Sequence, residues 1–415
     1  MDFLETVKNA KEASLKLANL SSEIKNSALK AVAEALENNR EKIMEANAKD
    51  LVSGQKLVEL SVLSQAVFNR LKLDENKMNA MIAGVKDLIK LDDPINKCLL
   101  ARELDNGLNL YKISTPIGVL GIIFEARPDV ITQVSALAIK SSNAVILKGG
   151  KEAINTNKAI FETIQEGLNN VKEYPKYAIN QVFSHEDVAK MLDMNDYIDL
   201  IIPRGGNSLV KFIKENTKIP VLGHADGICH IFIDKTADLK MATEIVIDSK
   251  TQYPSACNAV ETLLIHKDFK YSNELIEALK NAQIKMIDNP ESWAFEYSDK
   301  ILAYKIVEDI NEAIEHINKY GSGHTDAIIT EDVQNAERFL NEIDSAGVYH
   351  NASTRFSDGY RYGFGAEVGI STNKTHARGP VGLEGLTIYK YKLYGHGQTV
   401  KAYADGEKHF THKQL

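Results

Sequence analysis

The stretch GVLGIIFEARPDVITQVSALAIKSSNAVILKGG, residues 118–150, decides the fold class. It begins and ends with short apolar runs, at 118–124 and 144–150, and the segment between them is amphipathic. Short apolar runs separated by helical segments are typical of parallel strands that are buried on both faces of a sheet. The stretch therefore predicts a strand, a crossover helix and a second parallel strand.

The same rhythm recurs along most of the chain. Further strands of a first domain are predicted by QVFSH (181–185), DLIIPRGG (199–206) and IPVLG (219–223). A second series is CHIFID (229–234), ETLLIH (261–266), ILAYKIV (301–307), TDAIIT (325–330) and GVYHN (347–351), with helices at about 270–283, 308–319 and 332–343. Strands that alternate with helices indicate a doubly wound α/β architecture, and two such series indicate two domains.

Both ends of the chain differ from this pattern. The first hundred residues look helical throughout, and residues 351–382 form a long stretch rich in Gly, Ser, Thr, Arg and His. A loop of that length in a compact chain is usually functional or disordered, and its aromatic and charged residues favour function. The segment LTIYKYKLYGHGQTV (386–400) alternates apolar and polar residues. It predicts a strand or hairpin that packs on another subunit or domain.

Composition excludes several classes of protein. The 415 residues include 49 Lys and Arg against 57 Asp and Glu, and this mild acidic excess argues against a dedicated nucleic-acid surface. The amino terminus has early acidic residues and no apolar core, so no signal or transit peptide is expected. No apolar stretch approaches the roughly 18 residues of a membrane span. We expect a cytoplasmic protein of two domains.

The three cysteines have different contexts. Cys98, Cys229 and Cys257 are too few and too scattered for a disulfide framework or a Cys-based zinc site. Cys229 lies within an apolar strand and is interpreted as a core residue, whereas Cys98 has no supporting context. Cys257 lies in YPSACNAVETLLIH, in a turn that enters a strand, where its sulfur can face a cleft. Because a thiolate is a strong nucleophile, Cys257 is the candidate catalytic residue.

Two glycine pairs lie where predicted strands turn into helices. Glycine lets a ligand approach the backbone closely, and the N–H groups of a following helix attract anions. The pairs therefore suggest phosphate binding, although such pairs are also simply good turns. Neither matches GxGxxG, which argues against an ordinary Rossmann dinucleotide site. The residues concerned are Lys148, Gly149, Gly150 and Lys151 in the first stretch and Arg204, Gly205 and Gly206 in the second.

Several separate words of the sequence together resemble one family. They are GVLGIIFEARPDV, NAVILKGGKEA, LIIPRGG, YPSACNAVETLLIH, YGSGHTDAIITED, GVYHNASTRFSDG and GAEVGISTNKTHARGPVGLEGLTIYKY, in the family's order from about residue 110 to 394. The chain resembles the glutamate-5-semialdehyde dehydrogenases, also called gamma-glutamyl phosphate reductases, of the aldehyde dehydrogenase superfamily. The resemblance implies an aldehyde dehydrogenase-like α/β fold with three parts. These are N-terminal helices and an NADP-binding domain over 1–225, a catalytic domain over 226–380, and an oligomerisation strand or hairpin over 381–415.

The resemblance also implies a reaction, the NADPH-dependent reduction of L-glutamyl 5-phosphate in proline biosynthesis. Cys257 would attack the acyl phosphate, phosphate would leave, and the thioacyl enzyme would accept hydride and release L-glutamate 5-semialdehyde. The expected oxyanion donor is the backbone N–H of Cys257, with the Asn258 side chain as a weaker candidate. The unstable acyl phosphate must arrive from another protein, so transient contact with glutamate 5-kinase is a further expectation, as is a homo-oligomer.

Two departures from the superfamily bear on this reaction. Hydrolytic aldehyde dehydrogenases carry a glutamate that activates water, whereas this chain has Gly223, His224 and Ala225 in that stretch. The lack of a carboxylate there suits a thioester that must not meet activated water. The superfamily's oxyanion-binding asparagine falls near Ala126, and its replacement stays open.

Charge guides the assignment of the binding residues. A cation at Lys151 suits the 2′-phosphate of NADP, Lys148 would bind ribose hydroxyls, and Glu296 matches the superfamily glutamate that holds the nicotinamide ribose. The alternative for Glu296 is a surface carboxylate. Arginine binds carboxylate and phosphate in bidentate fashion, so arginines within the family words are the substrate-binding candidates. These are Arg127, Arg355 and Arg378, while Arg204 can serve the cofactor instead.

His324 and His376 lie near acidic residues, which could suggest a metal site. Neither HxxxH nor HxxE spacing is present, so no metal is expected. Two alternatives belong to the same superfamily: histidinol dehydrogenase, which needs zinc ligands, and a CoA-acylating aldehyde dehydrogenase. An alternative of another class is a non-redox thiol acyltransferase or a nucleotide-sensing module that kept the fold and lost the chemistry. The presence of Cys257, Lys148 and Glu296 speaks against such a loss.

Overall fold

The computed structural model describes residues 2–184, 186–224 and 226–415, which form two compact units. Unit 1 comprises the chain up to Gly205 together with Ile213–Val221 and Gly382–Leu415, and unit 2 comprises Gly206–Phe212 and Leu222–Val381. Helix α9 (Asn207–Glu215) therefore contributes to both. Among the described residues, no helix combines the length and apolarity that a membrane crossing requires.

Unit 1 is built on a four-stranded sheet in the order β5-β4-β3-β6, in which every pair is parallel. The strands are β3 (Val119–Phe124), β4 (Ala144–Gly149), β5 (Ile179–Val182) and β6 (Leu200–Arg204). Every residue of β3 is buried, as expected for a strand covered on both faces. The connections are α6 (Asp129–Lys140), the 3₁₀ turn η1 (Lys151–Ala153), α7 (Ile154–Asn169) and α8 (Glu186–Leu192).

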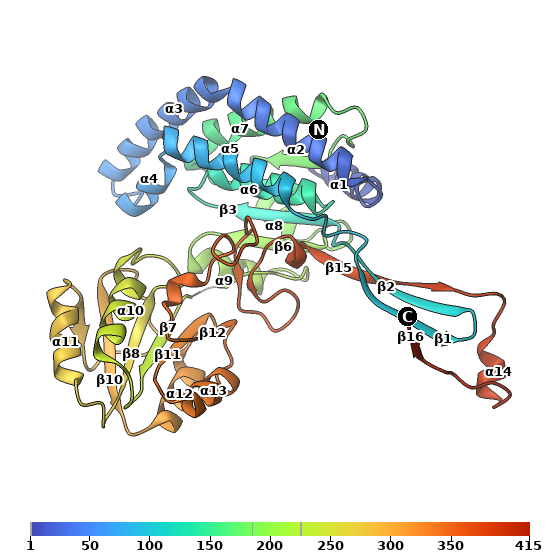
Figure 1. Ribbon diagram of the computed structural model, residues 1–415. Helices are drawn as coiled ribbons and strands as arrows, with labels where there is room; N and C mark the ends of the chain where they lie inside the picture. The colour runs from blue at the N-terminus through green and yellow to red at the C-terminus, as the bar shows by residue number, and fades with distance from the viewer. Residues whose placement is uncertain (1, 185, 225) are drawn as a thin grey trace. The chain divides into compact units, whose positions relative to one another are not determined.

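Five amino-terminal helices of the described chain precede this sheet, and α1, α2 and α5 each bury an apolar stripe. In α2, Leu29, Val32 and Leu36 recur at helical spacing and are fully buried, while Ser21 caps the helix by accepting a hydrogen bond from the backbone N–H of Ile24. In Figure 1, α2, α3, α5, α6 and α7 gather on one side of β3. The five helices are α1 (Phe3–Leu17), α2 (Ser22–Asn38), α3 (Arg40–Glu59), α4 (Gln65–Leu71) and α5 (Glu75–Lys90).

A second, antiparallel sheet of unit 1 has the order β15-β2-β1-β16. Strands β1 (Cys98–Asp105) and β2 (Leu108–Pro116) form a hairpin whose turn contains Gly107 at φ 71°. Strand β15 (Thr387–Tyr394), which follows the turn η3 (Glu384–Leu386), pairs with β2 along its whole length. Helix α14 (Val400–Ala404) and β16 (Lys413–Gln414) complete this part of the chain, which forms a ribbon in Figure 1.

Unit 2 has a six-stranded sheet in the order β12-β11-β7-β8-β10-β9, again with parallel pairs. Its strands are β7 (Cys229–Ile233), β8 (Val260–His266), β9 (Lys285–Ile287), β10 (Ile301–Val307), β11 (Thr325–Ile329) and β12 (Gly347–His350). Its helices are α10 (Leu239–Thr251), α11 (Ser272–Asn281), α12 (Ile310–Tyr320) and α13 (Val333–Glu342). The remaining short elements are η2 (Thr354–Phe356), β13 (Ile370–Ser371) and β14 (Gly379–Pro380).

The core of unit 2 lies on both faces of this sheet. Ile231 and Ile233 of β7 pack in the cluster that includes Leu275 of α11, whereas Phe232 packs in the cluster that includes Phe339 of α13. This alternation follows from the pleat, which directs successive side chains to opposite faces. Figure 1 shows α10 and α11 on one side of the sheet and α12 and α13 on the other. The doubly wound architecture predicted from the sequence is confirmed.

Two local predictions require comment. The run IPVLG (219–223) is not a strand, because its only ladder contact is an isolated bridge between Val221 and Ile201. QVFSH extends to His185, which lies outside the described residues, and the strand there is β5, which begins at Ile179. The expectation of helix over the first hundred residues is also wrong at its end, where β1 begins at Cys98.

Candidate active site

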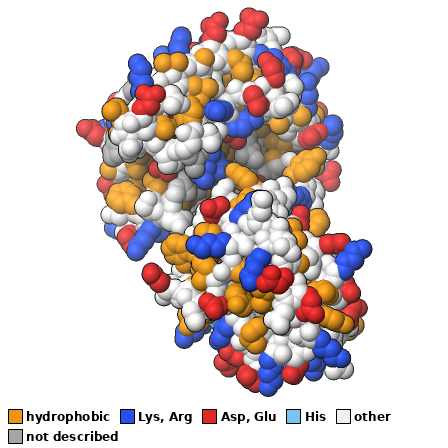
Figure 2. Space-filling model, turned by 90° about the vertical axis from the view of Figure 1, so that its left-hand side faces the viewer, with side chains coloured by type: hydrophobic (Ala, Val, Ile, Leu, Met, Phe, Trp, Pro, Cys, Tyr) orange, Lys and Arg blue, Asp and Glu red, His pale blue; other side chains and the backbone are white. Residues whose placement is uncertain are grey.

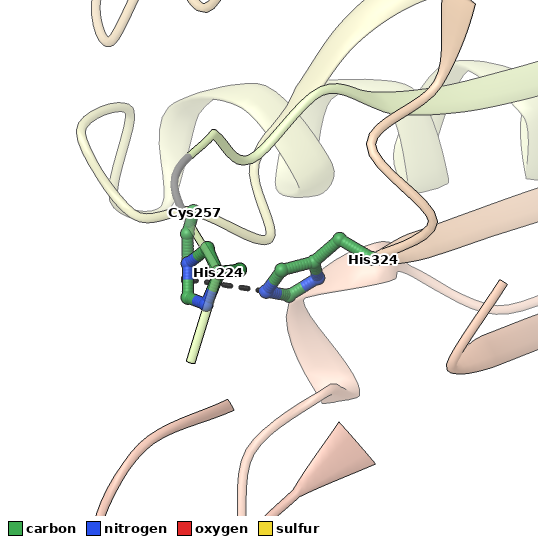
Figure 3. A group of neighbouring side chains, drawn as sticks. All are labelled: His224, Cys257 and His324. Carbon is green, nitrogen blue, oxygen red and sulfur yellow. Dashed lines mark hydrogen bonds between the residues drawn. The ribbon is translucent and has the colours of Figure 1, made fainter. Parts of the chain in front are cut away.

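A thiol–imidazole pair forms the centre of the site in unit 2. Cys257 lies in the turn between α10 and β8 and is partly exposed, and His324 directly precedes β11 and is buried. The Nε2 atom of His324 lies 3.2 Å from the Sγ atom of Cys257, within hydrogen-bonding distance for sulfur. Figure 3 shows the His324 ring directed at Cys257. This geometry allows the imidazole to accept the thiol proton.

The other side of the His324 ring is held by its neighbours. Its Nδ1 atom lies 2.9 Å from the Oγ1 atom of Thr325 and 3.9 Å from the Sγ atom of Cys229. When Nδ1 carries the proton and donates a hydrogen bond to Thr325, Nε2 carries the lone pair that can accept a hydrogen bond or proton from the thiol. Cys229 is fully buried, and burial raises the pKa of its thiol well above the ordinary value. Cys229 therefore stays a core thiol, as predicted.

The site lies at one edge of the sheet of unit 2. Cys257 precedes β8, His224 precedes β7 and His324 precedes β11, and these three strands are neighbours in the sheet. Because neighbouring parallel strands start at the same edge, residues just before them converge. The site is thus formed at the amino-terminal edge of the strands, opposite to the edge at which open α/β sheets usually bind ligands.

A glycine packs directly against the nucleophile. A Cβ atom placed on Gly227 would lie 2.1 Å from the carbonyl oxygen and 2.5 Å from the Cα atom of Cys257. The backbone N–H of Gly227 donates a hydrogen bond of 3.0 Å to the Oε2 atom of Glu296. The predicted cofactor residue Glu296 is therefore held, through Gly227, beside the turn that carries the thiol.

Asn258 lies next to the nucleophile but is largely buried. Its Nδ2 atom donates to the carbonyl oxygen of Ser357 at 2.7 Å, and its backbone carbonyl accepts from the Oγ1 atom of Thr354 at 2.6 Å. The amide thus ties the Cys257 turn to the loop that contains η2, and one of its donors is used in doing so.

Arg355 is a buried cation in unit 2. Its Nε atom donates to the neutral Oε1 atom of Gln252 at 2.9 Å, and its guanidinium lies 5.9 Å from the ring centre of Tyr253. Among the described residues, no carboxylate forms an ion pair with it. Burial, followed by the charge of Arg361, lowers the pKa of Arg355, whereas the charges of Cys257, Asp358 and Asp248 raise it. A buried cation that forms no ion pair with a carboxylate is suited to bind an anionic group of a ligand.

Arg378, by contrast, has an acidic partner. Its NH1 atom lies 3.1 Å from the Oδ1 atom of Asp344, and its NH2 atom donates to the carbonyl oxygen of Asp344 at 2.9 Å. Lys374 also pairs with Asp344, and the Lys374 hydrogen bond, ahead of Arg378, lowers the pKa of this carboxyl. In this structure Arg378 connects the segment that follows α13 to the stretch between β13 and β14.

The predicted cofactor residues other than Glu296 lie at or just after the carboxyl edge of the sheet of unit 1. Lys148 pairs in register with Ile123, and Arg204 pairs with Phe124. Burial lowers the pKa of Lys148, whose Nζ atom donates to the carbonyl oxygen of Gly149 at 2.7 Å. Ligands of open parallel sheets usually bind at this edge.

The two glycine pairs and their cations follow these strands. A Cβ atom on Gly149 would lie 2.2 Å from the Nδ2 atom of Asn157 and 2.8 Å from the ring of Phe124, so a larger residue there would have to displace these side chains. Lys151 is exposed and lies in η1. This short turn separates β4 from α7, so the strand does not pass directly into the α-helix as the sequence predicts. The other residues at this edge are Gly150, which precedes Lys151, Gly205 and Gly206, which follow β6 and are exposed, and Arg127, which lies half-buried between β3 and α6.

Two further positions were singled out by the sequence. Ala126 is buried at φ 48°, and its backbone N–H donates to the Oε1 atom of Glu152 at 2.6 Å. The Nδ1 atom of His224 lies 2.8 Å from the carbonyl oxygen of Ile370, while Ala225 lies outside the described residues.

The pairing of Cys257 with His324 could not be predicted from linear spacing, because 67 residues separate them. The sequence does contain one usable signal. GSGHTDAIIT places His324 directly before a buried strand, and YPSACNAVETLLIH places Cys257 in the same way. Residues before adjacent parallel strands meet, so this shared position could have suggested the pair.

The chain matches the model of the aldehyde dehydrogenase family over residues 1–294 and 301–373. It is 58% identical to the gamma-glutamyl phosphate reductase of Brachyspira hyodysenteriae, covering all of both chains. It is 49% identical to that of Methanococcoides burtonii, covering 100% of this chain and 97% of the other.

Solved structures agree. The gamma-glutamyl phosphate reductase of Thermotoga maritima is 39% identical, with a TM-score of 0.92 over 96% of this chain and all of that chain. A glyceraldehyde-3-phosphate dehydrogenase from Methanocaldococcus jannaschii, complexed with NADP, shares the fold at 14% identity, with a TM-score of 0.69 over 95% of this chain and 94% of that chain. The chain therefore belongs to the aldehyde dehydrogenase family and, within it, to the gamma-glutamyl phosphate reductases.

Proposed function

We propose that the protein reduces L-glutamyl 5-phosphate to L-glutamate 5-semialdehyde and phosphate in proline biosynthesis, through a thioester on Cys257. The observation that carries the proposal is the 3.2 Å contact between Cys257 and His324 in a chain that matches gamma-glutamyl phosphate reductases along its length. The relatives do not favour histidinol dehydrogenase or a CoA-acylating enzyme.

The thiol chemistry follows from this pair. His324 takes the proton of Cys257, the sulfur attacks the carbonyl carbon of the acyl phosphate, and the bond to phosphate breaks. The oxyanion is stabilised by the backbone N–H of Cys257, with Asn258 as a secondary donor. Hydride then adds to the thioester carbon, and collapse of the thiohemiacetal releases the aldehyde and restores the thiolate.

Arg355 is the candidate for binding an anionic group of the substrate. It is buried, it has a neutral hydrogen-bond partner, and the charge of Cys257 influences its pKa. A guanidinium in that position can bind the phosphate or the α-carboxylate. Arg378 stays a weaker candidate, because Asp344 already occupies part of its guanidinium. Arg127 lies in unit 1, at the sheet edge that carries the predicted cofactor residues.

The cofactor proposed is NADPH, which supplies the hydride when bound. Lys148, Lys151 and Arg204, with the glycine pairs that follow their strands, form a cationic edge that suits phosphate and ribose groups. Glu296 is the proposed partner of the nicotinamide ribose. Replacing Lys151 with Glu places a negative charge where the 2′-phosphate is expected. The ratio of kcat/KM for NADPH to that for NADH should then fall at least tenfold, and an unchanged ratio would remove the charge argument.

The protein is also proposed to act in the cytoplasm as a homo-oligomer, with the substrate supplied by glutamate 5-kinase. All three cysteines are free thiols, as a reducing compartment favours. Strand β15 of the antiparallel sheet exposes Tyr391 and Leu393, which are candidates for contact with a second copy of the chain.

The reverse reaction tests the proposal. The purified protein is incubated with glutamate semialdehyde and NADP, with and without phosphate, and NADPH is followed by absorbance. We expect turnover that depends on phosphate, because the thioester needs phosphate as its acceptor. Absence of turnover under both conditions would refute the reductase assignment.

Two variants test the roles of the pair. Cys257→Ala should abolish turnover and leave NADPH binding, measured by fluorescence titration, within twofold. His324→Gln should lower kcat by roughly 10²–10⁴-fold, the usual contribution of general base catalysis. It should also slow alkylation of Cys257 by iodoacetamide at neutral pH, as read by mass spectrometry. An active Cys257→Ala protein would place the nucleophile elsewhere.

A further inference from the structure

Three side chains that can bind metal converge at the site in unit 2. One nitrogen of His224, the Sγ atom of Cys257 and one nitrogen of His324 all lie within 4.8 Å of one another. The two imidazole rings are 4.8 Å apart between centres and cross at 82°. Figure 3 shows the three side chains gathered at one point, each coming from a different segment of the chain.

Both rings are oriented as metal-binding histidines usually are. Such a histidine donates one ring N–H to a protein oxygen, and this fixes the tautomer and the direction of the other nitrogen. The Nδ1 atom of His224 lies 2.8 Å from the carbonyl oxygen of Ile370, and that of His324 lies 2.9 Å from the Oγ1 atom of Thr325. With these protons on Nδ1, each Nε2 atom carries the lone pair that a cation requires.

The distances suit a small tetrahedral ion. Zinc binds sulfur at about 2.3 Å and nitrogen at about 2.0–2.1 Å, which places neighbouring ligand atoms roughly 3.3–3.7 Å apart. The sulfur of Cys257 and the Nε2 atom of His324 are already 3.2 Å apart. The main change required is an approach of the His224 ring, by at most about 1.5 Å.

The donor set determines which ion would bind. Two imidazoles and a thiolate favour a borderline-soft ion such as Zn²⁺, and the lack of a carboxylate in the group disfavours Mg²⁺ and Ca²⁺. Three protein ligands leave a fourth position for water.

We propose that His224, Cys257 and His324 bind one Zn²⁺ ion, and that zinc and acyl substrate exclude each other. Binding replaces the thiol proton, which is released to solvent, with a Zn–S bond. It uses the same sulfur lone pair that attacks the substrate and the same His324 nitrogen that accepts the proton. Zinc would thus be a reversible inhibitor that also protects the thiol from oxidation and alkylation. The exclusion rests on the proposed role of Cys257 as nucleophile, whereas the metal site does not.

Zinc binding is measured first without reference to activity. The full-length protein is titrated with Zn²⁺ in competition with a chromophoric chelator, and the modification of each cysteine by iodoacetamide is followed by mass spectrometry. We expect one zinc per chain and at least tenfold slower alkylation of Cys257 at saturating zinc. The exposed Cys98 serves as an internal control, and its alkylation rate should stay unchanged.

Variants then identify the ligands. His224→Ala leaves the Cys257–His324 contact in place and should weaken zinc binding at least tenfold, as should Cys257→Ser. The control is His409→Ala, at an exposed histidine of the C-terminal segment, which should bind zinc like the parent protein. Circular dichroism checks that each variant is folded.

The outcomes separate the two proposals. Zinc binding that is indifferent to His224→Ala and Cys257→Ser, or alkylation of Cys257 that zinc does not slow, would overturn the metal site even if the reductase reaction is present. Specific zinc binding in a protein without phosphate-dependent turnover would leave the metal site standing and remove the proposed function. Inhibition reversed by EDTA and relieved by excess acyl substrate is the result expected when both hold.

Discussion

Gly227 shows how one missing side chain determines the position of the nucleophile. It accepts no Cβ atom, because the backbone of Cys257 occupies the space, and its N–H binds Glu296. Steric contact with backbone cannot be relieved by a change of rotamer. The residue therefore ties three parts of the proposed mechanism together: the thiol, its turn and a carboxylate proposed to bind the cofactor.

Replacing Gly227 with Ala should displace the Cys257 turn by about 1 Å, because the new Cβ atom would lie 2.1 Å from the carbonyl oxygen of Cys257. We expect kcat/KM to fall by about 10²-fold, since misplacement of a reacting group by about 1 Å can have an effect of that size. The measurement is steady-state kinetics of the reverse reaction, together with the rate of Cys257 alkylation.

The matched control is Gly84→Ala in α5, where a Cβ atom would have no neighbour within 4 Å. That change should raise the free energy of unfolding by about 0.5–1 kcal/mol and leave the kinetics unchanged, because Ala is the better helix former. If the two variants had equal activity, Gly227 would have no role in placing the thiol.

The residues of the site differ in how far the sequence could predict them. Cys257 could be proposed from the sequence because a thiol in a turn before a buried strand is chemically unusual. Its contact with His324 was harder to predict, because the two residues are 67 positions apart and only their shared place before a strand relates them. The burial of Arg355 without an acidic partner could not be predicted either, since it depends on packing rather than residue type.

At the scale of elements, helix α10 and strand β8 are joined by a buried ion pair. Lys250 and Glu261 are both fully buried, and the Nζ and Oε2 atoms lie 2.7 Å apart. Burial, which outweighs the attraction of Lys250, raises the pKa of Glu261 to about 7. The Oε2 atom of Glu261 also accepts from the backbone N–H of Tyr297, next to Glu296.

Removing one partner of this pair should be costly. Lys250→Met leaves the Glu261 carboxyl buried without its cation, and we expect the free energy of unfolding to fall by about 3–5 kcal/mol. The double variant Lys250→Met with Glu261→Leu removes both charges and should regain most of that loss. Urea denaturation at neutral pH measures both. A double variant as unstable as the single one would show that packing, not charge, dominates there.

Helix α12 carries a histidine that should make the protein sensitive to acid. His316 is buried beside Trp293 and Tyr320, and burial followed by the charge of His230 lowers its pKa from 6.5 to about 3. The folded state therefore keeps His316 neutral, while the unfolded chain binds a proton below pH 6.5. Stability from this group is present above pH 6.5 and is lost as the pH falls towards 3.

His316→Leu should remove this dependence. In the parent protein, His316 should make the free energy of unfolding rise by about 1.4 kcal/mol per pH unit between pH 4 and 6.5, and the variant should lack this increase. Thermal or urea unfolding over a pH series provides the measurement, with the exposed His409→Leu as control. Identical slopes for His316→Leu and the parent protein would mean that His316 is protonated in the folded state.

Elements were predictable where the apolar run was long. ILAYKIV coincides with β10, and ETLLIH and TDAIIT match β8 and β11 to within one residue, because long apolar runs have few other places in a fold. The short strand β9, between β8 and β10 in the chain, was missed. The hairpin β1–β2 was missed although Asn106-Gly107 is a typical hairpin turn. Its strands are only partly buried, so their apolar pattern is weak. IPVLG was wrongly predicted as a strand, since an apolar run can contact a sheet through a single isolated bridge without forming a strand.

At the scale of the whole molecule, the acidic excess is small, with 57 Asp and Glu against 49 Lys and Arg. On the face drawn in Figure 2, Lys and Arg side chains alternate with Asp and Glu and form no large patch of one sign. This agrees with the small acidic excess in composition and with a small-molecule substrate rather than nucleic acid. Strand β15 exposes three aromatic side chains, those of Tyr389, Tyr391 and Tyr394.

Those residues lead to a prediction about assembly. Tyr391 and Leu393 point to the same face of β15, since they are two residues apart, and both are more than half exposed. Replacing both with Glu should convert the proposed homo-oligomer into smaller species in analytical ultracentrifugation. Lys390→Glu, on the opposite face of the same strand, should leave the sedimentation coefficient unchanged. A parent protein that sediments as a monomer would refute the prediction.

The thiol, the two imidazoles and Gly227 all lie at the amino-terminal edge of the sheet of unit 2. Their spacing therefore depends on the register of the backbone hydrogen bonds between β11, β7 and β8. A slip of one residue between neighbouring strands would move one group by roughly 3.3 Å and turn its side chain over. That displacement is as large as the 3.2 Å distance between the Sγ atom of Cys257 and the Nε2 atom of His324, the two atoms of the proposed proton transfer. Substitutions deep in the sheet, far from any reacting atom, can therefore disable the enzyme by changing strand alignment, even when the thiol and imidazole themselves are untouched.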